Sequence, residues 1–427
     1  MTLDFTLIAA LIIFVATYGL IISEKIHRTV LALFGAVLMI LLGIINQELA
    51  LESVDFNTLG LLIGMMVIVG IAKDSGMFQF VALWAARLAK GKPISIFLLL
   101  GFITALFSAF LDNVTTVLLM VPVTFVVCNN LKVNPMPFLI GTILLSNIGG
   151  TATLIGDPPN ILIGSAAQIP FNDFLIHLGP VILIVTFVTL AMLYGIYRKE
   201  LVATKEAQLS ILSFNPKDAI SDYPLLYRSL FVLALVLIGF FTHSMTHFEG
   251  ATIALGGAAL LLLLTLNDPE HHLRDVEWTT IFFFLGLFIL VGGLEKVGVI
   301  HFLAEKLVEV TDGQQVPLTL SVLWGSAFFS AAIDNIPFVA TMIPLIQSIG
   351  EFSPGVDVMP LWWALALGAD IGGNATLVGA SANVVVSGLA GKHGHRIGFF
   401  QYMKIAVPLT LVALLICTVY IYLRYLM

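Results

Sequence analysis

The chain has 427 residues and a formal net charge of −7, and 59% of its residues are hydrophobic whereas only 11% are charged. Apolar runs long enough to cross a bilayer as helices recur along it, so the composition predicts an all-α polytopic membrane protein and excludes a soluble enzyme domain. It has no basic run typical of nucleic-acid binding. The two cysteines, Cys128 and Cys417, lie in apolar segments and favour neither a disulfide nor a thiolate metal site.

About ten membrane spans are predicted, five in each half of the chain. The apolar runs of the first half cover residues 5–22, 30–46, 57–72, 137–165 and 174–197. Those of the second half cover residues 226–242, 250–266, 278–294, 360–390 and 403–424. Charged and apolar residues alternate at helical spacing in 77–90 and 299–310, which is typical of helices that lie along the membrane surface.

Residues 93–128 and 316–350 are each too long for one span, and each has an Asp-Asn pair at its centre. We interpret both as re-entrant hairpins. Backbone that leaves helical geometry at membrane depth is tolerated only where protein or a water-filled cavity satisfies it, so both tips are predicted to point inward.

Two polar motifs occur twice. Residues 109–122 and 331–344 share six of fourteen positions, and residues 147–160 and 370–383 share eight of fourteen. The duplication predicts two repeats, residues 1–222 and 223–427, with a cytoplasmic linker from residue 198 and broken helices at 137–165 and 360–390. Because each repeat has an odd number of spans, the second is predicted to be inverted relative to the first.

The distribution of positive charge supports this topology, because cytoplasmic loops collect lysine and arginine. With both termini outside, only Lys296, Lys306 and Arg424 fall outside, and the other 16 of the 19 basic residues, Arg28 among them, fall inside. The expected location is the inner (plasma) membrane.

The predicted site consists of polar residues in the four repeated segments, because ionisable residues at membrane depth are costly to bury and usually functional. Four carboxylates qualify, and no lysine or arginine lies in these segments. Glycines there let the span backbone unwind and expose free amides and carbonyls. The predicted solute- or ion-binding residues are Asp112, Asn113, Thr115, Thr116, Asn147, Gly150, Thr151, Thr153, Asp157, Asn160, Asp334, Asn335, Asp370, Gly373, Asn374, Thr376, Ser381 and Asn383.

The hairpin aspartates and the histidines each have a simpler explanation than a binding role. Asp112 and Asp334 could merely cap the second arm of each hairpin, but two copies at matched depth, each followed by a glycine-broken span, favour a site at the repeat interface. Six histidines fall in predicted loops, where solvated side chains are favoured over a metal site. These are His243, His247, His271, His272, His393 and His395.

These motifs resemble the ion transporter superfamily, in the branch of arsenite permeases and the pigmentation P protein with its citrate-transporter-like domain. Residues 111–119, 147–160 and 379–385 carry the resemblance, which runs over nearly the whole chain. It implies an inverted-repeat fold, a substrate site between hairpin tips and broken helices, a homodimer and elevator-type alternating access. The superfamily's sodium-coupled carboxylate carriers have Ser-Asn-Thr at these places, whereas this chain has Asp-Asn-Val-Thr and Asp-Asn-Ile-Pro. Carboxylate transport is therefore a less favoured function.

The leading hypothesis is a secondary transporter that exports arsenite or antimonite, as the neutral trihydroxide, in exchange for protons and so confers arsenical resistance. Up to four carboxylates without a fixed cation repel a multivalent anion, which favours a neutral solute or a small cation. Asp112 and Asp334 are expected to carry the coupling protons. The solute's hydroxyls are expected to donate to these carboxylates and to accept from Asn113, Asn335, Thr153 and Thr376.

Sodium/proton antiport is the alternative, because Asp112, Asp334, Asp370 and unwound carbonyls offer oxygen ligands to a hard cation. The coupling ion is thus H⁺ or Na⁺. Transport of chloride or another small anion comes third, and the repeat symmetry disfavours an intramembrane aspartyl protease. No cofactor or resident metal is expected, and a cytoplasmic ATPase subunit as a partner is left open.

Overall fold

The computed structural model describes residues 5–23, 25–266 and 268–427, and these residues fold into helices joined by short connections. The first half contains α1 (Phe5–Ile22), α2 (Arg28–Leu41), α3 (Gln47–Glu52), α4 (Phe56–Lys73), α5 (Met77–Leu88), α6 (Pro93–Leu111), α7 (Asn113–Leu131), α8 (Met136–Gly150), α9 (Pro158–Ala167), α10 (Phe171–Tyr197), α11 (Lys205–Ser213) and η1 (Pro216–Ala219). The second half contains α12 (Tyr223–Thr246), α13 (Gly250–Thr265), α14 (Pro269–Arg274), α15 (Trp278–Lys296), α16 (Val299–Val310), α17 (Gln315–Ala332), α18 (Asn335–Phe352), α19 (Met359–Gly373), α20 (Ser381–Lys392), α21 (Phe399–Ile421) and η2 (Tyr422–Leu426).

Eight helices of the described chain are long and apolar enough to cross a membrane, so the protein is a polytopic membrane protein. They are α1, α4, α6, α7, α10, α12, α15 and α21 with its η2 extension. Six of the ten predicted spans are among them, and the other two long helices, α6 and α7, were predicted as one hairpin. Of the remaining predicted spans, α2 has 14 residues and α13 has 16, and those at 137–165 and 360–390 are interrupted. The prediction carried the α2 span to residue 46 because Leu41, Leu42, Ile44 and Ile45 are apolar. The helix ends earlier because Gly43 has a φ of +70°, a left-handed conformation that stops helices.

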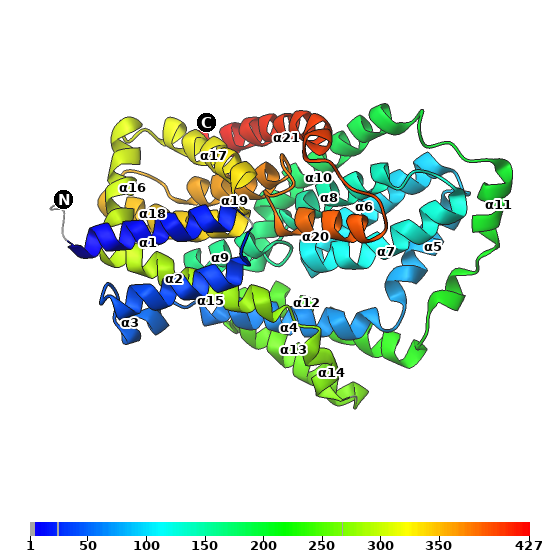
Figure 1. Cartoon of the computed structure of the whole chain (residues 1–427), viewed down its shortest axis with the longest axis horizontal. Coiled ribbons are helices and arrows are strands. Elements are labelled where there is room, and N and C mark those ends of the chain that lie inside the picture. Colours follow the sequence, from blue (N-terminus) through cyan, green and yellow to red (C-terminus); the bar gives the residue numbers. More distant parts are fainter. Residues whose placement is uncertain (1–4, 24, 267) are drawn as a thin grey trace.

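Two helical hairpins lie toward opposite ends of the molecule (Figure 1). Asp112 alone separates α6 from α7, and Ile333 with Asp334 separates α17 from α18. The segments predicted as hairpins, 93–128 and 316–350, are each a pair of helices with the Asp-Asn motif between them. The short helices predicted at 77–90 and 299–310 are α5 and α16.

Two interrupted helices lie between the hairpins (Figure 1). The chain leaves helical geometry after Gly150 and re-enters it at Pro158, and it does the same between Gly373 and Ser381. The breaks predicted in 137–165 and 360–390 are therefore present. Both cysteines are buried and free.

The glycines before each break allow close helix packing. A Cβ on Gly149 would lie 2.1 Å from the Ala105 carbonyl oxygen of α6, and one on Gly372 would lie 2.4 Å from Cα of Ala327 of α17. Neither glycine has a positive φ. These two residues bring each interrupted helix into backbone contact with the first arm of a hairpin.

Helix packing is reciprocal between the halves. In chain order α2 corresponds to α13 and α4 to α15, and the structure packs α2 on α15 and α4 on α13. In the same way α9 packs on α18 while α20 packs on α7. Each half therefore supplies one member of every such pair, and neither half can form these contacts alone.

We predict that Gly149→Ala and Gly372→Ala lower the melting temperature of the purified protein, because overpacking a close contact costs about 1–3 kcal/mol. Gly19→Ala is the matched control, since a Cβ at Gly19 of α1 meets no atom within 4 Å. Equal melting temperatures for all three variants in detergent would contradict the packing role.

Candidate functional site

The polar site is centred on Asp157, which precedes α9 and is 1% exposed. Nδ2 of Asn113, at the start of α7, donates to one Asp157 carboxylate oxygen over 2.7 Å. Nδ2 of Asn335, at the start of α18, donates to the other over 3.4 Å. One buried carboxylate therefore joins the tips of both hairpins.

Asn147, in the last turn of α8, links the two interrupted helices. Its Oδ1 accepts from Asn113 over 3.1 Å. Its Nδ2 donates to Oδ1 of Asn374 over 2.9 Å and to Oδ1 of Asn383 over 2.8 Å. The network thus runs without a gap from the first hairpin through α8 to both sides of the second break.

Two asparagines support the unwound segments. Nδ2 of Asn160 donates to the carbonyl oxygens of Gly150, Thr151 and Thr153 over 3.0–3.4 Å. Nδ2 of Asn383 donates to those of Gly373 and Thr376 over 2.9 and 2.8 Å. These bonds satisfy carbonyls that the helix breaks leave free.

Two threonines hold the hairpins to the breaks. The Thr376 hydroxyl donates to the Ala331 carbonyl oxygen over 2.6 Å, and the Thr153 hydroxyl donates to that of Ala109. Each threonine follows a helix break, and each acceptor lies near the end of a hairpin's first arm. In this structure the two hydroxyls donate to backbone carbonyl oxygens, whereas the sequence prediction has them donate to the solute.

Asp370, in α19, is 0% exposed, and neither carboxylate oxygen accepts a hydrogen bond from the described residues. Thr151, Asn160 and Asn335 lie beside it, and it is close enough to Asp157 for the two charges to repel. Oδ1 of Asn113 and Oδ1 of Asn160 are also buried without a partner. Buried carboxylates without partners are costly unless a proton or a cation compensates them.

The two hairpin tips differ in their surroundings. The Asp112 carboxylate accepts from the Thr115 amide over 2.9 Å, so Asp112 caps α7 as the simpler explanation held. Its backbone has φ 88° and ψ 152°, a conformation largely restricted to glycine and therefore strained. Asp334 caps α18 through the Ile336 amide with an ordinary φ of −47°.

Arg28 pairs with the second tip only. Its Nη1 lies 2.6 Å from Oδ2 of Asp334 and 2.8 Å from Oγ of Ser381, and the Ser381 hydroxyl donates to the same Asp334 oxygen over 2.8 Å. The expectation of a site without a fixed cation is therefore wrong. Arg28 begins α2 and lies 306 positions from Asp334, so no local motif connects them, and sequence reasoning counted it only as a cytoplasmic loop charge.

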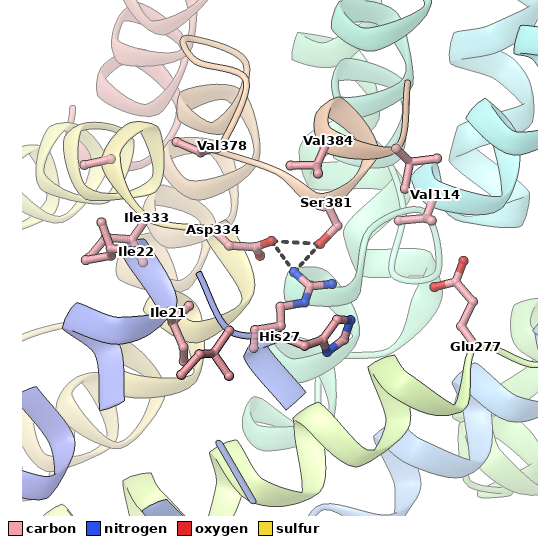
Figure 2. Close-up of a pocket in the computed structure, with 14 residues that line it drawn as sticks. Ile21, Ile22, His27, Val114, Glu277, Ile333, Asp334, Val378, Ser381 and Val384 are labelled. Atoms are coloured by element: carbon pink, nitrogen blue, oxygen red, sulfur yellow. Dashed lines mark hydrogen bonds and ion pairs between the residues drawn. The ribbon is translucent and has the colours of Figure 1, made fainter. Parts of the chain in front are cut away.

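A cavity of about 370 Å³ opens beside this ion pair. Figure 2 shows Asp334 and Ser381 pointing toward one another, with Glu277 entering from another element. Val114 and Val384 add apolar surface to the lining. Burial raises the pKa of the Glu277 carboxyl, whereas the nearby Arg28 opposes that rise. Glu277 was not among the predicted residues, because it precedes α15 outside every repeated motif.

Most of the predicted residues are brought together. Sixteen of the eighteen are buried, and Thr115 and Asp334 are half-buried. Hydrogen bonds connect Asn113, Asn147, Asp157, Asn335, Asn374 and Asn383 in one network. The Thr151 hydroxyl donates back to the Asn147 carbonyl oxygen, and the buried Thr116 hydroxyl has no partner among the described residues.

Comparisons with known proteins show where this architecture belongs. The family model described as "Citrate transporter" matches residues 18–368. The chain is 42% identical to the 46 kDa membrane protein of Mycobacterium leprae, over 98% of this chain and 99% of that protein. It is 34% identical to the P protein of Homo sapiens, over 95% of this chain and 58% of that protein.

A solved structure agrees in fold. The YdaH transporter of Alcanivorax borkumensis superimposes with a TM-score of 0.60 at 14% identity, over 97% of this chain and 98% of that one. This likeness shows the fold, and the family match identifies the chain as a member of a transporter family and not as an enzyme. The chain belongs to the citrate-transporter family of the ion transporter superfamily, the group that its duplicated Asp-Asn and Gly-Gly motifs resemble.

Proposed function

We propose that the chain is a proton-coupled secondary transporter that exchanges protons for a small inorganic solute. The observation that carries this proposal is the buried Asp370 carboxyl beside a second buried carboxyl, Asp157, since neither Asp370 oxygen accepts a hydrogen bond of standard length and angle from the described residues. Such a pair is stable only when protons or a cation compensate it. A site that binds a proton or cation in one conformation and releases it in another can couple the movement of that ion to the movement of the solute.

The proposal extends to the architecture. We interpret residues 1–222 and 223–427 as inverted repeats, α6–α7 and α17–α18 as re-entrant hairpins, and the protein as a plasma-membrane homodimer with both termini outside. The reciprocal packing of α2 on α15 and α4 on α13 supports the repeats. These four helices are then the static part of an elevator, and the hairpins with the interrupted helices are the moving part.

The first candidate solute is arsenite or antimonite as the neutral trihydroxide. Carboxylate oxygens of the proposed site can accept from the solute's hydroxyls, and asparagine amides can donate to them once they exchange their present hydrogen bonds within the protein. Asp112 and Asp334 are the proposed proton carriers. Asp334 already has a charged partner, because Nη1 of Arg28 lies 2.6 Å from its carboxylate.

Na⁺ is the second candidate, and the unpaired oxygens favour it. Both oxygens of Asp370 and Oδ1 of Asn113 and Asn160 are buried acceptors that no donor among the described residues meets in standard hydrogen-bond geometry. Hard cations prefer such oxygen ligands. In this alternative Na⁺ and protons compete for Asp370 and Asp157.

One transport experiment separates the candidates. Purified protein in liposomes with an internal pH dye and an imposed proton gradient receives arsenite, antimonite, Na⁺ or Li⁺ in turn, with protein-free liposomes as the blank. Metalloid/proton exchange predicts a pH change with arsenite or antimonite alone. A response to Na⁺ or Li⁺ alone identifies a cation antiporter, and silence to all four rules out both.

We predict that Asp112→Asn, Asp334→Asn and Asp370→Asn each abolish this pH response, because an amide cannot carry the coupling proton. The Asp370 variant should fold at least as stably as the parent, since it replaces a buried carboxyl by a neutral group of the same shape. Asp312→Asn, at an exposed turn, is the control with unchanged transport. Wild-type rates in any of the three variants remove that residue from the coupling mechanism.

The Arg28–Asp334 pair is tested by a double-mutant cycle. Arg28→Gln is expected to lower the melting temperature because it leaves a half-buried carboxylate unpaired, and Arg28→Gln with Asp334→Asn should recover part of the loss. The interaction energy expected for groups in contact is about 0.5–3 kcal/mol. Arg274→Gln removes an exposed 3.5 Å pair with Glu270 and serves as the control. Additive effects at positions 28 and 334 would show that the pair contributes no stability.

A further inference from the structure

His272 is a buried histidine that the transport site does not use. It lies on α14 and is 2% exposed, and neither ring nitrogen has a hydrogen-bond partner among the described residues. The sequence interpretation of His272 as a solvated loop residue is therefore wrong. Buried polar atoms are almost always satisfied, so two orphaned nitrogens on one ring call for a ligand.

Two further ligand atoms lie beside this ring. The nitrogens of His271 and His272 and a carboxylate oxygen of Asp74 all lie within 4.8 Å of one another. Nδ1 of His272 is 3.9 Å from Oδ2 of Asp74, which is too long for a hydrogen bond. Two metal–ligand bonds of about 2.0–2.2 Å each span about 4.2 Å at most, so an ion fits between these two atoms.

Hydrogen bonds fix the backbone on both sides of the cluster, while two of its three side chains can still rotate. The Ser221 hydroxyl donates to the Asp74 carbonyl oxygen over 2.6 Å, which fixes the turn after α4. Trp278 Nε1 donates to the Leu273 carbonyl oxygen over 2.9 Å and fixes the end of α14. His271 and Asp74 are exposed and can rotate toward an ion, whereas the buried His272 ring is the fixed member.

We propose that Asp74, His271 and His272 form a binding site for a divalent transition metal of the zinc class, with a fourth position open to water. Two imidazoles and one carboxylate are a ligand set that zinc uses, and imidazole selects such metals over magnesium. The ion joins the α4–α5 turn to α14, which precedes α15. This site is separate from the proposed transport site, and it does not depend on the identity of the transported solute.

Co²⁺ is the probe for the test, because tetrahedral cobalt absorbs visible light. The full-length protein, purified in detergent without a histidine tag and stripped with a chelator, is titrated with Co²⁺. The expected result is one tightly bound Co²⁺ per chain that Zn²⁺ displaces and Mg²⁺ does not. Bound Zn²⁺ should also raise the melting temperature, because a ligand that binds only the folded state stabilises it.

Asp74→Ala and His271→Ala change exposed side chains and should weaken Co²⁺ binding at least about tenfold while the protein stays folded. His272→Gln should do the same, and if it fails to fold the other two variants still decide the matter. The double variant His243→Ala/His247→Ala, with two histidines outside the cluster, is the matched control. Unchanged binding in Asp74→Ala and His271→Ala, or binding lost in the control, would overturn the assignment.

Discussion

The hydrogen bonds from Asn113 and Asn335 to Asp157 are the constraint on which the rest of the site depends. They bring two hairpin tips, one from each half of the chain, to one buried carboxylate. Hydrogen bonds to a charged acceptor are about twice as strong as neutral ones, and they strengthen further where water is excluded. A displacement of either hairpin therefore changes the stability of charge on Asp157, and through Asp157 it changes that of Asp370. The hairpins and the two buried carboxyls form one electrostatic unit.

The two repeats contribute unequal halves to this unit. Asn147 of the first repeat corresponds to Asp370 of the second, and Asp157 corresponds to Ala380, so each repeat supplies one buried acid at a different place. The tips are unequal too, since Asp112 has a strained backbone whereas Asp334 has an ion pair with Arg28. Because the backbone is strained at Asp112 and an ion pair holds Asp334, the free energy needed to move the first hairpin differs from that needed to move the second.

The sequence predicted the hairpins, the helix breaks and most of the buried polar residues, because each depends on local chemistry repeated in both halves. An Asp-Asn pair in an apolar run, or two glycines before an interruption, has few structural solutions in a membrane. The end of α2 was misplaced because apolar composition continues past Leu41 while the left-handed Gly43 ends the helix. Arg28 and His272 were misread for another reason. The carboxylates that lie near them, Asp334 and Asp74, are far away in the chain, and only the fold brings them together.

Arg28 also changes the electrostatic argument about the solute. Four carboxylates without a cation amount to a formal charge of −4 when all are ionised. Arg28 brings this sum to −3, and an ionised Glu277 in the same cavity would return it to −4. Because Arg28 is bound to Asp334 and Ser381, an anion could use it only after Asp334 takes up a proton or moves away. Proton binding at Asp334 and anion binding at Arg28 would then be favourable together, which is the linkage of a symporter. A neutral solute or a cation that competes with protons for the carboxylates gives the opposite linkage, that of an antiporter. If Asp334 carries the coupling proton, the charge of the solute therefore decides whether protons and solute move in the same direction or in opposite directions.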